Sequence, residues 1–164
     1  MEYTDLHDRE IRADSSNFAI DINHDGRVDL GFITQLVGDP INQVDKHQFI
    51  VITNIQANLP VNNLEEVPVM NAGDDIPLQH FNGYQWFELS NVLLLQKIIS
   101  FTQPPVWEGH WKNAKHKFMP FQLIADSKRF NGWIELSVDE IGEKIILHRL
   151  AISKLGEKMV KAGN

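Results

Sequence analysis

Three carboxylates and one amide surround a single glycine in the segment D-I-N-H-D-G-R-V-D, residues 21–29. Side chains two positions apart can converge in a tightly curled loop, and a glycine at the sixth position permits the sharp turn. Ca²⁺ is bound by about six to eight hard oxygen ligands, one of them usually the backbone carbonyl at the seventh position. The spacing therefore predicts a calcium site. Its expected ligands are Asp21, Asn23, Asp25, the carbonyl of Arg27, and Asp29.

The loop differs from an EF-hand loop at its twelfth position, where Phe32 stands in place of a bidentate Glu. Strand-like sequence flanks it on both sides, where an EF-hand has helices. The shorter form D-x-N-x-D-G-x-x-D resembles the calcium loops of FG-GAP-type propeller blades. The alternative is an Asx-rich turn that binds nothing, although converging carboxylates repel one another without a cation. Three carboxylates on an open hairpin indicate a weak site, with a Kd of about 10⁻⁴–10⁻³ M, and a structural role.

Two tryptophans, Trp107 and Trp111, lie four positions apart in V-W-E-G-H-W-K. Exposed aromatic rings with polar neighbours can stack on sugar rings, so these residues are candidates for a carbohydrate-binding site. The alternative is that both rings cover one end of the core, because Trp is mostly buried. The chain has no nucleophile elbow, phosphate loop or metalloprotease motif. We expect a non-enzymatic protein, with hydrolase as a remote alternative.

The elements that must position these residues are short strands. F-A-I-D-I and D-L-G-F-I-T-Q-L-V (29–37) flank the acidic loop, and G-W-I-E-L-S-V-D alternates with Ile134, Leu136 and Val138 on one face. Residues 91–101 fit either a helix or a strand. The pattern predicts an all-β chain, an antiparallel jelly-roll-like β-sandwich or open barrel with few short helices. Residues 1–16 are expected to be a polar lead-in to one domain, 17–164.

Bulk properties narrow the possible partners and the compartment. The 164 residues carry a net charge of −7, which argues against binding to nucleic acid. No apolar run is long enough for a transmembrane segment, and the absence of Cys excludes disulfides. A weak calcium site requires calcium-rich surroundings. We therefore expect an extracytoplasmic protein (secreted, periplasmic or lipid-anchored), with its signal sequence absent from this chain.

The C-terminal third carries K-F-M-P-F-Q-L, F-N-G-W-I-E-L-S-V-D, K-I-I-L-H-R-L-A-I-S and G-E-K-M-V-K-A-G-N. Together with the acidic loop, this order resembles a family of uncharacterised secreted and lipoprotein β-domains from Bacteroidetes-like bacteria. The chain departs from that pattern at Asn131, where Tyr is usual, and at Glu135, where Arg is usual. The resemblance implies an exported β-domain without an assigned enzymatic activity. Its expected role is an interaction module whose partner is an unknown protein or glycan at the cell envelope.

Overall fold

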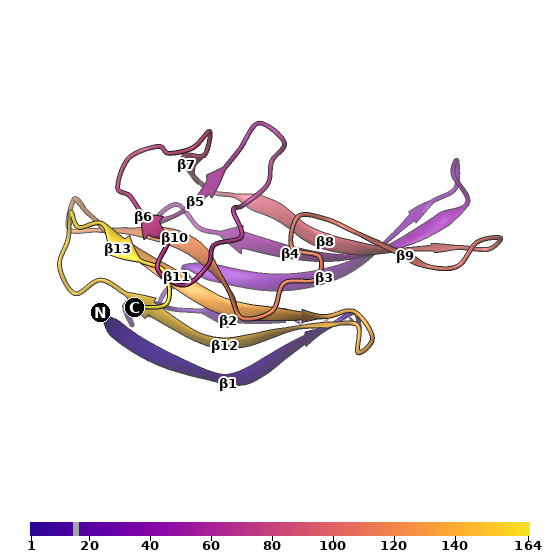
Figure 1. The fold of residues 1–164 in the computed structure, drawn as a ribbon, viewed down its shortest axis with the longest axis horizontal. Helices are drawn as coiled ribbons and strands as arrows, with labels where there is room; N and C mark the ends of the chain where they lie inside the picture. The colour runs from indigo at the N-terminus through magenta and orange to yellow at the C-terminus, as the bar shows by residue number, and fades with distance from the viewer. Residues whose placement is uncertain (15–16) are drawn as a thin grey trace.

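A computed structural model of the chain describes residues 1–14 and 17–164, and this part of the chain is all β, without a helix. Two antiparallel sheets face each other, and a third, two-stranded sheet lies beside them (Figure 1). None of the sheets closes on itself. The predicted all-β fold is confirmed, and of its two forms the structure is a sandwich.

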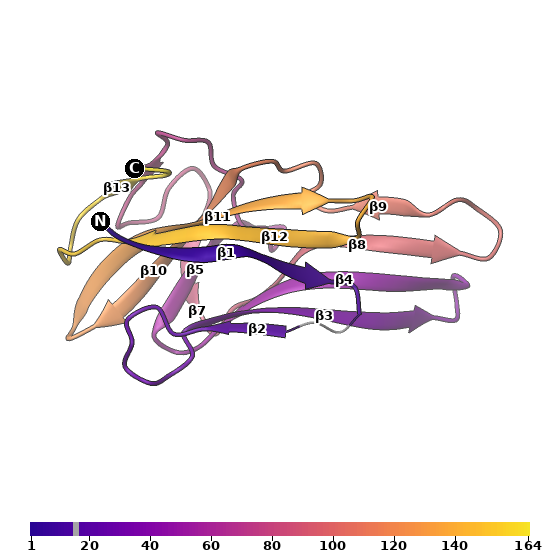
Figure 2. The same ribbon diagram turned by 90° about the horizontal axis from the view of Figure 1, so that it is seen from below.

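The larger sheet has six strands, and the facing sheet has five (Figure 2). In spatial order the larger sheet comprises β1 (Glu2–Arg12), β12 (Lys144–Ile152), β11 (Lys128–Asp139), β10 (Lys117–Ala125), β5 (Ala57–Val61) and β7 (Gln85–Glu88). The facing sheet comprises β2 (Asn17–Ile20), β3 (Leu30–Asp39), β4 (Val44–Thr53), β8 (Asn91–Ser100) and β9 (Val106–Glu108). The small sheet pairs β6 (Asp75–Ile76) with β13 (Val160–Lys161).

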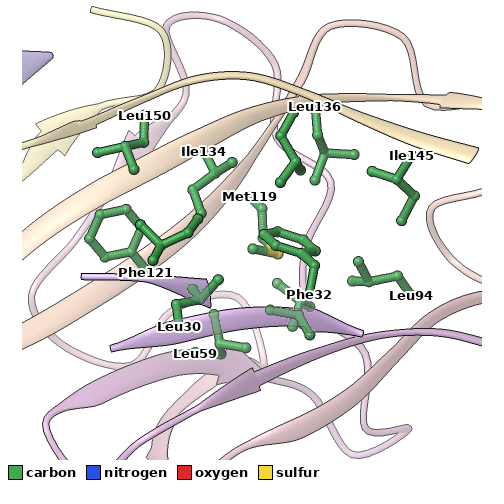
Figure 3. Close-up of a cluster of buried hydrophobic side chains, with 14 of the residues drawn as sticks. Leu30, Phe32, Leu59, Leu94, Met119, Phe121, Ile134, Leu136, Ile145 and Leu150 are labelled. Carbon is green, nitrogen blue, oxygen red and sulfur yellow. The ribbon is translucent and has the colours of Figure 1, made fainter. Parts of the chain in front are cut away.

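The main core lies between the two large sheets, where alternate residues of each strand point inward. Ile134, Leu136 and Val138 of β11 all belong to it, as their alternation predicts. Figure 3 shows Ile134 and Leu136 directed toward Phe32 and Leu94 of the opposite sheet. The predicted face of this strand is therefore confirmed.

A second, smaller core lies on the other face of the six-stranded sheet. Trp133 is fully buried there against Phe118, with ring centroids 5.1 Å apart, and Ile76 and Val160 of the small sheet pack with them. Two buried amides hold the covering segment in place: Asn131 donates to the Ile76 carbonyl at 2.9 Å, and Gln122 donates to Asn131 at 2.9 Å. The six-stranded sheet is thus covered on part of both faces.

One expectation is corrected. Most of the expected polar lead-in forms β1, which pairs with β12 and buries Leu6 and Ile11. Residues 91–100, which fit either element, form a strand. Pro120 lies on β10 inside the sheet, although proline is usually confined to edge strands or bulges. The proline is tolerated because β10 pairs with β5 only at Gln122 and Leu123.

Across residues 1–14 and 17–164 there is no helix long and apolar enough to cross a membrane.

Candidate functional site

The acidic loop connects β2 to β3 at one edge of the five-stranded sheet (Figure 2). Its end is closed by backbone hydrogen bonds: the N–H of Asp29 donates to the Ile20 carbonyl at 2.9 Å, and the N–H of Asn54 donates to the Asp29 carbonyl at 3.0 Å. Gly26 has a φ of 88°, a conformation that a side chain would strain. The loop is therefore a hairpin connection of defined shape, held to its own strands and to the chain after β4.

Inside the loop, side-chain oxygens accept hydrogen bonds from the backbone. Asp21 accepts the N–H of Gly26 at 2.8 Å and that of Asp25 at 3.2 Å. Asn23 accepts the Asp25 N–H at 3.1 Å, and Asp25 accepts the Arg27 N–H at 2.9 Å. These bonds curl the backbone around the three side chains. A carboxylate oxygen has two acceptor sites, so each can still face a cation.

Asp29 is the unusual member of the loop because it has an exposed fraction of 0%. Its Oδ2 accepts the Ile22 N–H at 2.7 Å, whereas its Oδ1 is buried without a hydrogen-bond partner among the described residues. Burial raises the pKa of the Asp29 carboxyl, and the carboxylates of Asp25 and Asp21 raise this pKa further, whereas the backbone N–H groups of Ile22 and Asn23 lower it. A buried carboxylate oxygen without a partner is costly.

The predicted ligands thus belong to one loop, although they do not form a closed metal cage. Within the described residues, no group of three His, Cys, Asp or Glu side chains is placed so that it could hold a metal. Besides its three carboxylates, the loop offers the side-chain amide oxygen of Asn23 as a metal ligand. The backbone carbonyl of Arg27 would be the fifth oxygen ligand. Oxygen donors of these kinds suit Ca²⁺, and the unpartnered Oδ1 of Asp29 is compatible with a cation there.

The two candidate tryptophans do not form an exposed pair. Trp111 has an exposed fraction of 0%, and its indole N–H donates to the Val67 carbonyl at 3.2 Å. Trp107 on β9 is half-buried against Phe49, with ring centroids 6.0 Å apart. Trp111 therefore cannot stack on a sugar, and the alternative in which the rings cover the core describes it. The chain places both rings against the core because they supply its largest apolar surfaces.

The structure also gathers a polar cluster that the sequence did not reveal, on the outer face of the six-stranded sheet. The Ser137 hydroxyl lies 2.8 Å from His148 Nε2, and His148 Nδ1 lies 2.6 Å from Asp8. The rings of His148 and His116 stack at 4.3 Å, and His116 lies 2.8 Å from Glu135. Four separate segments supply these residues, so no local motif could have indicated them.

The order serine, histidine, carboxylate is that of an activated nucleophile. However, Ser137 has an exposed fraction of 4%, and its hydroxyl also accepts the His116 N–H at 2.9 Å. The Ser137 hydroxyl therefore has two hydrogen-bond partners, the His148 ring and the His116 backbone N–H. The cluster ties β1, β11 and β12 together, and the burial of Ser137 favours this structural role.

Comparison of the chain with protein-family models, curated proteins and solved structures found no match.

Proposed function

We propose that the chain is an exported, non-enzymatic β-sandwich module, stabilised by one Ca²⁺ in the loop between β2 and β3. The observation that carries this proposal is the fully buried Asp29 carboxylate, whose Oδ1 has no hydrogen-bond partner within residues 1–14 and 17–164. A divalent cation would give that oxygen a partner and offset the repulsion from Asp21 and Asp25. Burial is the main cause that raises the pKa of Asp29, and those two carboxylates raise it further.

The oxygen ligands of the loop favour calcium over magnesium. Mg²⁺ demands near-ideal octahedral geometry and retains several waters, whereas Ca²⁺ accepts flexible cages of carboxylate, amide and carbonyl oxygens. The loop supplies three carboxylates, one amide and one carbonyl within nine residues. The role is structural, since the loop joins two paired strands.

The proposed location follows from affinity. Calcium sites of extracellular modules have Kd values of about 10⁻⁴–10⁻³ M, much weaker than those of cytosolic sensors. An open loop of this kind would fill only where calcium is abundant. This supports export to the periplasm or cell surface, in line with the resemblance to secreted and lipid-anchored β-domains.

A calcium titration with thermal unfolding tests the metal. At a Kd near 0.1 mM, 1 mM calcium would stabilise the fold by about 1.4 kcal/mol, which raises Tm by roughly 3–6 °C for a chain of this size. Asp25→Ala should abolish the shift. Asp45→Ala is the matched control, because Asp45 pairs with Gly38 at the opposite end of β3 from the loop. An unchanged wild-type Tm at 10 mM calcium would refute the metal site.

A further inference from the structure

The outer face of the five-stranded sheet carries two adjacent rows of side chains with different chemistry. One row crosses four strands and consists of Gln35, Gln48, Gln96 and Glu108. The next row consists of Ile33, Ile50 and Leu93, which are register partners on β3, β4 and β8. A polar row therefore runs beside an apolar row across the same face.

The polar row is a hydrogen-bonded ladder. The Gln35 amide donates to Gln48 at 2.8 Å, and the Gln48 amide donates to Gln96 at 2.9 Å. Gln96 in turn donates to Glu108 at 3.5 Å. Each amide carries two hydrogens and two acceptor sites, so one ladder bond leaves further donors and acceptors for a ligand. The ladder fixes the amide planes before any ligand arrives, which reduces the entropy lost on binding.

A groove lies over this face. Its cavity of about 380 Å³ is lined by Gln35, Gln48, Leu93 and Asn91, and by the segments 64–66 and 109–110. A second cavity, of about 470 Å³, shares Asn91 with it and extends past Phe87, which is half exposed. Both volumes fall in the range of about 300–1,000 Å³ typical of ligand sites.

The wall of the groove is built from two anchored turns. Asn62 accepts the N–H groups of Leu64 and Glu66 at 2.9 and 3.0 Å, which closes the turn at 62–66. The buried Trp111 bonds the chain just after this turn, through the Val67 carbonyl at 3.2 Å. Trp111 thus holds the two sides of the wall together.

We propose that this groove binds a neutral glycan chain. Planar amides recognise sugar hydroxyls as paired donors and acceptors, and Leu93, Leu64 and Phe87 suit the C–H faces of the rings. The charges select against acidic ligands, because Glu65, Glu66 and Glu88 line the cavities and the chain has a net charge of −7. A glycan ligand would specify the partner of the proposed interaction module. The inference therefore rests on the proposed role as an interaction module and is independent of the proposed calcium site.

Affinity electrophoresis through gels containing hydroxyethylcellulose, xylan, galactomannan or starch tests this proposal, with alginate as the acidic polysaccharide. Wild-type protein should be retarded by at least one neutral polysaccharide and not by alginate. Gln48→Ala should weaken that binding by about 2- to 13-fold, which is the loss of one hydrogen bond. Gln103→Ala is the matched control, since Gln103 is exposed on the loop between β8 and β9, outside the groove.

Tm measurements on each variant separate lost binding from lost folding. If Gln48→Ala lowers Tm, Gln35→Ala at the exposed end of the ladder replaces it. The proposal is overturned if no neutral polysaccharide retards the wild type, if alginate binds equally well, or if both Gln variants bind like the wild type. A calcium-dependent Tm shift in the same wild-type sample shows that such a failure concerns the groove and not the metal site.

Discussion

Substitution of the buried carboxylate by an isosteric amide, Asp29→Asn, gives opposite results with and without calcium. In the wild type, Asp29 Oδ2 accepts the Ile22 N–H at 2.7 Å, while Oδ1 has no hydrogen-bond partner in the described part of the chain. An Asn at this position keeps the acceptor and the shape but removes the charge. Without calcium, the substitution therefore removes an electrostatic penalty, and the variant should be more stable.

The expected changes in stability follow from the burial of the Asp29 charge and from the linkage between calcium binding and folding. The substitution leaves a polar atom at the buried position but removes its charge, and with it the repulsion from Asp21 and Asp25. Relief of about 1–2 kcal/mol of unfavourable electrostatic energy should raise the Tm of the calcium-free variant by roughly 2–8 °C. At calcium a hundredfold above Kd, the wild type gains about 2.7 kcal/mol. A tenfold weaker Kd in Asp29→Asn would reduce that gain to about 1.4 kcal/mol.

Calorimetry of both proteins at pH 7.5, in EDTA and in 10 mM calcium, measures these four Tm values. Asp45→Asn is the control and should behave like the wild type in both conditions. We expect the variant to unfold at a higher temperature in EDTA and to show about half of the wild-type calcium shift. A lower Tm in EDTA together with an equal calcium shift would refute the assignment of Asp29 as an unpaired ligand.

Three further substitutions test the fold. Asn131→Ala should lower stability by about 1–3 kcal/mol in urea unfolding, because it releases the covering segment. Gly132→Ala should cost about 1–3 kcal/mol by the same assay, since a Cβ there would lie 2.3 Å from the Phe121 ring. Arg129 lowers the pKa of Glu157 from 4.5 to about 2, so this pair stabilises the fold above pH 4.5. The Tm deficit of Glu157→Gln should vanish between pH 4.5 and 2.

The sequence predicted features whose causes are local. The acidic loop could be recognised because its donors and its glycine lie within nine residues, and the face of β11 because alternation from Trp133 to Val138 is unbroken. β1 was missed for an equally physical reason. Its pairing with β12 shifts register between Asp5 and Arg9, where His7 and Asp8 have positive φ. That bulge interrupts the period of two on which strand prediction depends.

Features assembled from distant segments could not be predicted. The glutamine ladder joins residues 35, 48, 96 and 108, which become neighbours only when strand order and register are known. The burial of Trp111 likewise depends on the Val67 carbonyl, 44 residues away. Sequence spacing identified a pair of rings but not which way either one faces.

The position of the loop indicates what a bound cation would stabilise. The chain crosses from β4 in one sheet to β5 in the other at residues 54–56, and hydrogen bonds of Asn54 hold that crossing in place. Its N–H and its side-chain amide donate to the carbonyls of Asp29 and Val28, and its own carbonyl accepts the Leu89 N–H at 3.3 Å. A cation held by the loop would therefore brace the crossing between the sheets as well as the β2–β3 edge, and its removal should loosen both.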